Sequence, residues 1–452
     1  MNNRKLVDGF KAMGFAVGFG DKEVPANLEV RDNKIELTLL LLSRNPLDIL
    51  SEEKEPVPGS ILFSSTEVKV NLSKLRVSRQ KSEIFSGIRV KTFIVKRAVC
   101  TAEDIDHNQI HGMTSELEGF DRWAEQQSIS TNLIFGGSQG EPPKVMLKAE
   151  VQQPVLLGSS FNVQANAGFM FPAPTAYSTS YTIHNVATLR SQTADLKTWE
   201  EHQQIHRMIQ GLVCLVYGYP CSMRLKEVLR TDNQPYLSED TQETSDKYYW
   251  HESFERNFGR SRYLEPRKEI KDYKPLFRLS DTNPADMESW IENFDKWSRP
   301  TWIAVESIFQ PYLAAESRML LIGSAMEALG YAIWLYEENG GDAESCGKGR
   351  CRGSRSGCHK PGCNKPNATG YFERAAKELP WEGLNISSEE SIQSWAFEFN
   401  RIYKGCKHAD NPLPDGTEAF DRANEGLTVI RCWLAKKLGV SDEVLTDTII
   451  SL

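Results

Sequence analysis

The chain has 452 residues, a hydrophobic content of 40%, a charged content of 25% and a formal net charge of -8. One hydrophobic core rarely serves a chain of this length, so we expect two or three domains. The composition is that of a globular protein, and the acidic net charge argues against a protein that coats nucleic acid non-specifically. Any contact with nucleic acid must therefore come from a local basic patch.

The first fifteen residues contain no apolar segment of the kind found in signal peptides. The longest apolar run, around 39–42, is far too short to span a bilayer. We therefore expect a cytoplasmic protein without membrane association, in which thiols stay reduced. The nine cysteines then need an explanation other than disulfides.

Alternation of apolar and polar residues recurs over roughly the first 190 residues and predicts strands. The clearest case is LEVRDNKIELTL at 28–39, where Asp32 and Asn33 separate two alternating runs and predict a hairpin. The spacing becomes helical at 196–217. From 232 to 284 the sequence is polar, charged and interrupted by proline, which favours a long connection across the surface.

From Asp286 onward the pattern is helical. The apolar stretch 306–338 predicts a long helix that is bent or begins again near Pro311. Further helices are predicted at about 370–378, 388–408, 416–438 and 441–450. The sequence thus predicts an α+β protein, with a β-rich, sandwich-like domain at 1–284 followed by an all-α helical bundle at 285–452.

The segment EFNRIYKGCKHADN contains Arg401, Lys404, Lys407 and His408. Seven residues of an α-helix turn through roughly 700°, about 20° short of two turns, so Arg401 and His408 point the same way. The apolar residues of this helix fall on its opposite side: Ile392, Trp395, Phe399, Ile402 and Cys406. We therefore expect Arg401 and His408 to face solvent or a partner.

Arg401 and His408 have the chemistry to cleave RNA. A guanidinium binds phosphate and stays charged, whereas an imidazole transfers protons near neutral pH. Together they suit a phosphodiester attacked by its neighbouring 2'-hydroxyl, a reaction that needs no metal. One histidine cannot easily be both base and acid, so two copies meeting at a dimer interface are better equipped. Gly405 lies between them on this face, and the alternatives for it are a notch for a ligand oxygen or a kink in the helix. The alternative is a solvated helix face without function.

An arginine followed after six residues by a histidine, late in a helical bundle, resembles the HEPN nuclease superfamily with its motif Arg-x(4–6)-His. Here the motif reads Arg401-Ile-Tyr-Lys-Gly-Cys-Lys-His408. The N-terminal part is similar to the N-terminal domain of ApeA-type bacterial anti-phage proteins, in VPANLEVRDNKIELTLL, in the strand-rich middle and in QIHGMTSELEGFDRWA. The closing segment AKKLGVSDEVLTDTI is also typical of such bundles.

The resemblance implies a metal-independent endoribonuclease that acts as an effector of anti-phage, abortive-infection defence. Its HEPN bundle would form a homodimer or higher oligomer, with Arg401 and His408 of both copies in a composite site. The N-terminal domain would sense a phage-derived trigger, and tRNA is a candidate substrate by analogy with other HEPN toxins. HEPN nucleases usually have a polar residue after the arginine, where this chain has Ile402. The alternative is an inactive HEPN module that binds RNA or nucleotide and serves assembly.

Residues 345–366 form a cysteine-rich segment with five glycines and almost no apolar side chain. Such a segment cannot bury a core, so another interaction must order it. Four thiolates around one tetrahedral Zn²⁺ per chain would do so, with no catalytic role because all positions are filled. The predicted ligands are Cys346, Cys351, Cys358 and Cys363. His359 could replace one of them, and the alternatives are a disordered loop or redox-active thiols.

The cysteine-rich segment also carries cations and no acid between 345 and 366. We expect it to contact the RNA backbone and to carry RNA to the Arg401–His408 face. The predicted RNA-binding residues are Lys348, Arg350, Arg352 and Arg355, with Lys404 and Lys407 on the helix. The alternative is a solvated run of charge.

Two further features concern helical positions. EHQQIH places His202 and His206 four residues apart, but it lacks the glutamate of a zinc protease, so a solvated helix face is the interpretation. Glu327, in the long apolar helix, could face the Arg401–His408 helix and orient Arg401.

Overall fold

The computed structural model of the chain places most of its residues. It describes residues 6–18, 20–42, 58–83, 88–101, 103, 105–134, 144–171, 182–233, 250–261, 269–340, 366–377 and 389–451.

The first six strands close into a barrel. They are β1 (Lys11–Gly18), β2 (Gly20–Arg31), β3 (Lys34–Leu42), β4 (Ser60–Ser64), β5 (Lys69–Glu83) and β6 (Ile88–Cys100). Every pairing is antiparallel, and the ring closes because β6 pairs with both β3 and β5 while β1 pairs with both β2 and β4. The sandwich-like expectation is therefore corrected for this part. Alternation places apolar residues inside either architecture, and only the pairing of distant strands distinguishes them.

The predicted hairpin is confirmed at the turn between β2 and β3. Asp32 and Asn33 have φ angles of 52° and 55°, and Arg31 pairs with Lys34 across the turn. Two residues in the left-handed region match the right-handed twist of the flanking strands, which is why Asp and Asn are favoured there.

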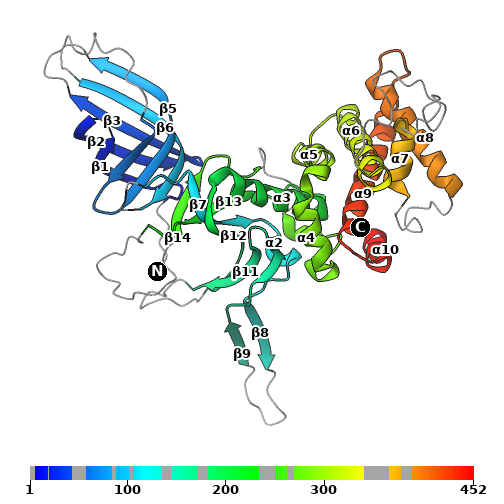
Figure 1. The fold of residues 1–452 in the computed structure, drawn as a ribbon, viewed down its shortest axis with the longest axis horizontal. Helices are drawn as coiled ribbons and strands as arrows, with labels where there is room; N and C mark the ends of the chain where they lie inside the picture. Colours follow the sequence, from blue (N-terminus) through cyan, green and yellow to red (C-terminus); the bar gives the residue numbers. More distant parts are fainter. Residues whose placement is uncertain are drawn as a thin grey trace.

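A second set of strands extends the same sheet away from the barrel (Figure 1). The order β10-β11-β12-β7-β13-β14 continues into barrel strand β6. These strands are β7 (Gln109–Leu117), β10 (Val155–Gly158), β11 (Val163–Met170), β12 (His184–Thr198), β13 (Met223–Leu229) and β14 (Trp250–Glu255). A separate hairpin of β8 (Ile129–Ile134) and β9 (Lys144–Ala149) projects from this part, and a short helix α2 (Phe120–Trp123) follows β7.

Strand β14 contradicts the prediction of a continuous surface connection at 232–284. It lies between β13 and β6, and its Glu255 carboxylate is buried. Glu255 accepts hydrogen bonds from Arg97 of β6 at 3.3 Å and from the indole of Trp199 at 2.6 Å. The Arg97 guanidinium also lies over the Trp199 ring at 4.7 Å. Because β14 buries an ion pair, its sequence contains charged and polar residues. The sequence of β14 therefore resembles that of a surface loop, which is why the strand was not predicted.

The helices follow the predicted segments closely. They are α3 (Trp199–Tyr217), α4 (Pro284–Glu292), α5 (Phe294–Phe309), α6 (Ala315–Ile333) continuing as a π-helix at Trp334–Glu338, α7 (Ala368–Ala376), α8 (Glu389–Lys407), α9 (Gly416–Lys437) and α10 (Asp442–Ser451), with 3-10 turns at Ile270–Asp272 and Leu279–Asp281. Within the apolar stretch 306–338, helix α5 ends at Phe309 and helix α6 begins at Ala315, as Pro311 predicts. Helix α3 begins with a capping box in which Thr198 and Glu201 bond each other's backbone.

Two large hydrophobic cores hold most of the buried apolar side chains among the described residues, beside a small cluster of Trp334, Leu335 and Tyr371. The first fills the barrel and includes Phe254 of β14. The second is continuous from β7, β11, β12, β13 and α3 through α4–α10. The predicted boundary at 284/285 lies in the first turn of α4, and the second core runs across it. Figure 1 shows the barrel at one end, the helices α4–α10 at the other, and the extended sheet with α3 between them.

Arg431 of α9 ties the late helices to α3. Its Nε donates to the carbonyl of Leu215 at 2.7 Å and an Nη to that of Val216 at 2.9 Å, both in the last turn of α3. The negative end of the α3 dipole favours a cation at this position. Helix α9 thus stabilises the end of a helix that lies about two hundred residues earlier in the chain.

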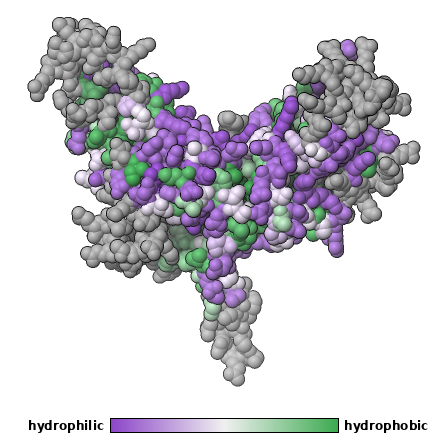
Figure 2. Space-filling view, viewed as in Figure 1, coloured by the Kyte–Doolittle hydropathy of each residue, from purple (hydrophilic) through white to green (hydrophobic). Residues whose placement is uncertain are grey.

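One stretch of the described residues, Ala315–Glu338, is long and apolar enough to cross a membrane by length and composition alone. Its most apolar window is 61% buried inside the protein, as in the central helix of a bundle. The surface in Figure 2 is hydrophilic over most of its coloured area, with apolar residues scattered across it.

Candidate functional site

Helix α8 is fixed by its apolar side, as predicted. Ile392, Trp395, Phe399 and Ile402 are buried against α6, α7 and α9. Helix α6 approaches closely because Gly323 lies under the ring of Tyr403, where a Cβ would collide with ring atoms. This packing leaves the side of α8 that carries Arg401 directed outward.

Arg401 is half exposed and is held by two carboxylates. Its Nε donates to Glu398 at 2.7 Å and an Nη to Glu418 of α9 at 2.5 Å. These hydrogen bonds, that of Glu398 first, raise the pKa of Arg401 above its ordinary value. The guanidinium is therefore charged and oriented, and a phosphate that binds it must compete with Glu398 and Glu418.

His408 lies one residue beyond the end of α8 and is exposed. Its amide donates to the carbonyl of Lys404 at 2.9 Å, so the backbone continues the helical turn. Within the described part of the chain, its imidazole has no hydrogen-bond partner. Arg401 and His408 thus both reach the surface at the C-terminal end of α8.

The predicted notch at Gly405 is wrong. A Cβ at this position would lie 2.7 Å from the carbonyl oxygen of Pro412 and 3.0 Å from Pro414. The connection between α8 and α9 therefore folds back over Gly405 and fills the space beside it. Glycine is needed here so that this connection can approach the helix, and it leaves no room for a ligand oxygen.

Glu327 faces α8, as predicted, but it does not orient Arg401. Its carboxylate accepts a hydrogen bond from the Tyr403 hydroxyl at 3.2 Å and lies 3.6 Å from the Lys407 ammonium. Lys407 also donates to Tyr403 at 3.1 Å, and the bonds to Tyr403 and Glu327 raise its pKa. Lys404 and Lys407 are both exposed, and the Glu327 carboxylate partly neutralises Lys407.

The predicted zinc ligands and the cations of the cysteine-rich segment lie outside the described residues. These are Cys346, Cys351, Cys358 and Cys363, and Lys348, Arg350, Arg352 and Arg355. Both assignments stay predictions. Within the residues that the structure describes, no group of three or more His, Cys, Asp or Glu side chains is placed to hold a metal ion.

His202 and His206 are buried, so their interpretation as a solvated face is wrong. The Ser191 hydroxyl lies 2.8 Å from Nδ1 of His202 and 3.0 Å from Nε2 of His206, whose Nδ1 lies 2.6 Å from the Ser115 hydroxyl. Burial lowers the pKa of His202 to about 4 and that of His206 to about 3. Both imidazoles are therefore neutral and structural near pH 7. Helix α3 packs against strands on one side and α5 on the other, which its sequence alone does not indicate.

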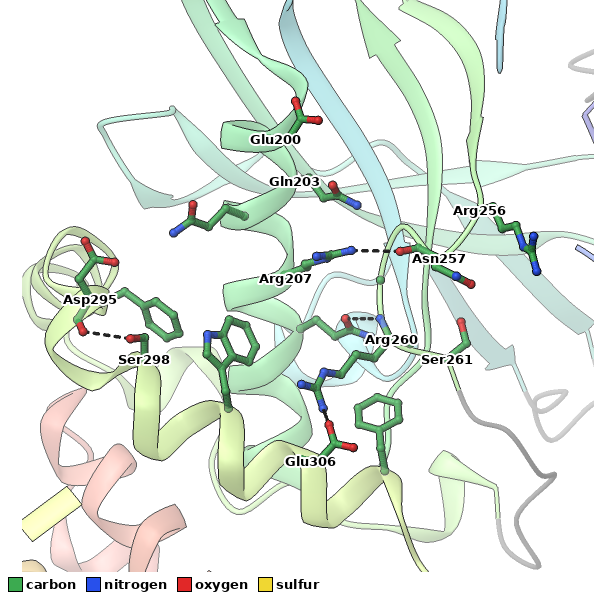
Figure 3. Close-up of a pocket in the computed structure, with 16 residues that line it drawn as sticks. Glu200, Gln203, Arg207, Arg256, Asn257, Arg260, Ser261, Asp295, Ser298 and Glu306 are labelled. Atoms are coloured by element: carbon green, nitrogen blue, oxygen red, sulfur yellow. Dashed lines mark hydrogen bonds and ion pairs between the residues drawn. The ribbon is translucent and has the colours of Figure 1, made fainter. Parts of the chain in front are cut away.

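A cavity of about 1230 Å³, which the sequence did not predict, lies between α3, α5 and the turn that follows β14 (Figure 3). Helix α3 contributes Gln203, Arg207 and Gln210 to it, at positions i, i+4 and i+7. A polar stripe at helical spacing on a largely apolar helix was the signal available in the sequence, and Gln203 and Gln210 within it are buried.

The described fold defines an α+β protein, in which a barrel and an extended antiparallel sheet precede a group of helices. A family model described as ApeA N-terminal domain 1 matches residues 16–294. The match covers more than half of the chain, which therefore belongs to the ApeA family of anti-phage proteins. Neither a search of curated proteins nor a search of solved structures found a match. Family membership supports a role in anti-phage defence.

Proposed function

We propose that the protein is a metal-independent HEPN-type endoribonuclease and an abortive-infection effector, with tRNA as a candidate substrate. The observation that carries this proposal is the exposure of both Arg401 and His408 at one end of α8, opposite its buried apolar side. The ApeA domain at 16–294 would restrain the nuclease until it senses a phage-derived trigger.

Cleavage would proceed by transfer within the RNA itself. The imidazole of His408 takes the proton of a 2'-hydroxyl, whose oxygen bonds to the adjacent phosphorus as the bond to the 5'-oxygen breaks. Arg401 stabilises the charge that grows on the non-bridging oxygens. The second His408, from the other copy, protonates the departing 5'-oxygen. The products are a 2',3'-cyclic phosphate and a 5'-hydroxyl.

Exposed apolar side chains beside this face support assembly of two copies. Phe397 lies one turn before Arg401 on the same side of α8, and its surface is 51% exposed. Leu413 is 69% exposed and lies between the two prolines that cover Gly405. An apolar rim next to Arg401 and His408 suits an interface that brings two Arg401–His408 faces together.

The cysteine-rich segment would bind one structural Zn²⁺ through Cys346, Cys351, Cys358 and Cys363, and would present its cations to RNA. Thiolate ligands require reduced cysteines, which is consistent with a cytoplasmic location. With four protein ligands, such a site keeps no open position for catalysis.

The test incubates purified protein with total RNA in EDTA and maps the cut ends. We expect cyclic phosphate ends, and roughly a 100- to 10,000-fold loss of cleavage in His408→Ala. Arg401→Ala should lose cleavage as well. His184→Ala, which changes an exposed histidine on β12, is the matched control and should cleave normally. Circular dichroism checks that each protein remains folded in EDTA.

The same experiment separates the two candidate functions. Cleavage that persists in His408→Ala would reject the assignment of this residue. A parent protein that binds RNA but does not cut it would favour the alternative function, an inactive module that binds RNA and serves assembly. This alternative is considered because Ile402 follows the arginine, where HEPN nucleases usually have a polar residue. Phe397→Glu combined with Leu413→Glu should yield monomers by analytical ultracentrifugation and abolish cleavage.

A further inference from the structure

The cavity between α3, α5 and the turn after β14 has a wall that is fixed in advance. Gln203 and Arg207 both donate to the carbonyl of Phe258, at 2.7 and 2.9 Å, and Arg207 also donates to that of Asn257 at 3.0 Å. Gln210 accepts from the amide of Arg260 at 3.0 Å and donates to its carbonyl at 2.7 Å. Three side chains of α3 thus hold residues 257–260, so little ordering remains to oppose ligand binding.

Planar groups line the opposite side of the cavity. Trp302 and Phe309 of α5 are two turns apart on one face of the helix, and the Arg260 guanidinium lies 5.9 Å from the centroid of each ring. Arg260 forms an ion pair with Glu306, which lies between the two aromatic residues on α5. Aromatic rings and guanidinium planes both stack on nucleic-acid bases.

The charges of the lining favour an anion. Three arginines line the cavity, Arg207, Arg256 and Arg260, against the carboxylates Glu200, Asp295 and Glu306. Glu200 is already neutralised from outside the cavity, by Lys74 at 2.7 Å and Arg97 at 2.9 Å. Positive charge is therefore in excess. Figure 3 shows Arg207 extending from α3 to Asn257 and Arg260 extending to Glu306 on α5.

We propose that this cavity is a nucleotide-binding site. The phosphate binds the free donors of Arg207 and displaces Glu306 from Arg260, while the base stacks against Trp302 and the guanidinium of Arg260. The exposed side-chain amide of Gln204 lies in the same lining and suits the polar edge of a base. A volume of about 1230 Å³ is ample for a nucleotide.

The position of the site connects two parts of the chain. Its α3 and turn residues lie within the family match, whereas Asp295–Phe309 follow its end at 294. Helix α5 packs on α6, and α6 packs on α8. Displacement of Glu306 by a phosphate therefore acts on the first helix of the path that leads to α8. The binding site itself does not depend on whether Arg401 and His408 are catalytic.

The test is calorimetric titration of the full-length protein with AMP, GMP, CMP, UMP, their triphosphates and inorganic pyrophosphate. We expect at least one nucleotide to bind, with affinity at least tenfold lower in Trp302→Ala while pyrophosphate affinity changes less than threefold. Arg260→Lys keeps the charge but loses the planar guanidinium, and should lower the affinity for the nucleotide at least tenfold. Glu306→Gln removes the competing carboxylate and should tighten binding severalfold.

Arg278→Lys, at an exposed ion pair with Glu125, is the matched control and should bind as the parent does. The proposal is overturned if no nucleotide binds, or if Trp302→Ala and Arg260→Lys, shown folded by circular dichroism, bind like the parent. Weaker binding in Glu306→Gln would also overturn it, because the proposal has the phosphate displace this carboxylate from Arg260. If nucleotides bind no more tightly than pyrophosphate, the site recognises phosphate alone. That result would reject a role for the aromatic residues.

Discussion

Replacing Arg431 by methionine tests whether the late helices are joined energetically to the ApeA domain. Methionine keeps an apolar stem of similar length and removes the two hydrogen bonds to Leu215 and Val216. A hydrogen bond to a charged group contributes about 1.5–3 kcal/mol, and a cation at a helix C-terminus up to about 2 kcal/mol. These contributions overlap, so they are not summed.

Two effects reduce the loss. Burial lowers the pKa of Arg431, so removing the guanidinium recovers its desolvation cost. Each carbonyl also keeps another donor, the amide of Gly218 for Leu215 and the amide of Leu276 for Val216. We therefore expect Arg431→Met to lower the free energy of unfolding by about 2 kcal/mol.

Urea unfolding followed by tryptophan fluorescence measures this loss. The matched control is Arg422→Met on the same helix, which removes a partly exposed ion pair with Glu425 and should cost less than about 1 kcal/mol. Arg431→Lys retains the positive charge but lacks the planar guanidinium, so its free energy of unfolding should lie between those of the parent and of Arg431→Met. A loss in Arg431→Met no larger than that in Arg422→Met would refute the argument that α9 stabilises α3 through this contact.

Three further predictions concern other parts of the chain. Gly405→Ala should cost about 1–3 kcal/mol in urea unfolding because its Cβ meets Pro412, whereas Gly416→Ala has open space and should cost nothing. Burial lowers the pKa of His206 to about 3, whereas the pKa of this histidine in the unfolded chain is about 6.5, so the unfolded chain binds the proton first as the pH drops. The free energy of unfolding should therefore fall between pH 6.5 and pH 3, by about 2 kcal/mol at pH 5 for this residue. His206→Gln should show a correspondingly smaller fall. Metal analysis of the protein as purified, before any chelator is added, should give about one zinc per chain, and a protein that is purified folded without metal would contradict the proposed thiolate site.

Local pattern was enough to predict the elements whose form depends on neighbouring residues. The Asp32–Asn33 turn, the new helix after Pro311 and the buried side of α8 all follow from spacing and turn chemistry within a few residues. The exposure of Arg401 and His408 followed from the same helical spacing.

Features that depend on distant partners could not be predicted in this way. Closure of the barrel requires β1 to pair with β4 and β5 with β6, and alternation does not specify which strand lies beside which. Strand β14 is polar because Glu255 pairs with Arg97, more than 150 residues away. Gly405 suggested open space on its own helix, whereas Pro412 occupies that space from the following connection.

Neither hydrophobic core is formed by one uninterrupted length of chain. Phe254 completes the barrel core from beyond α3, and Val99 of barrel strand β6 belongs to the second core. A fragment that stops after β6 would lack Phe254, and a fragment that begins at α4 would expose the apolar sides of α5 and α9 to water. Dividing the chain after β6 or before α4 would therefore leave apolar core residues without the side chains that cover them. For the same reason, recombination between relatives should preserve the gene segment from β1 to α10 as one inherited unit.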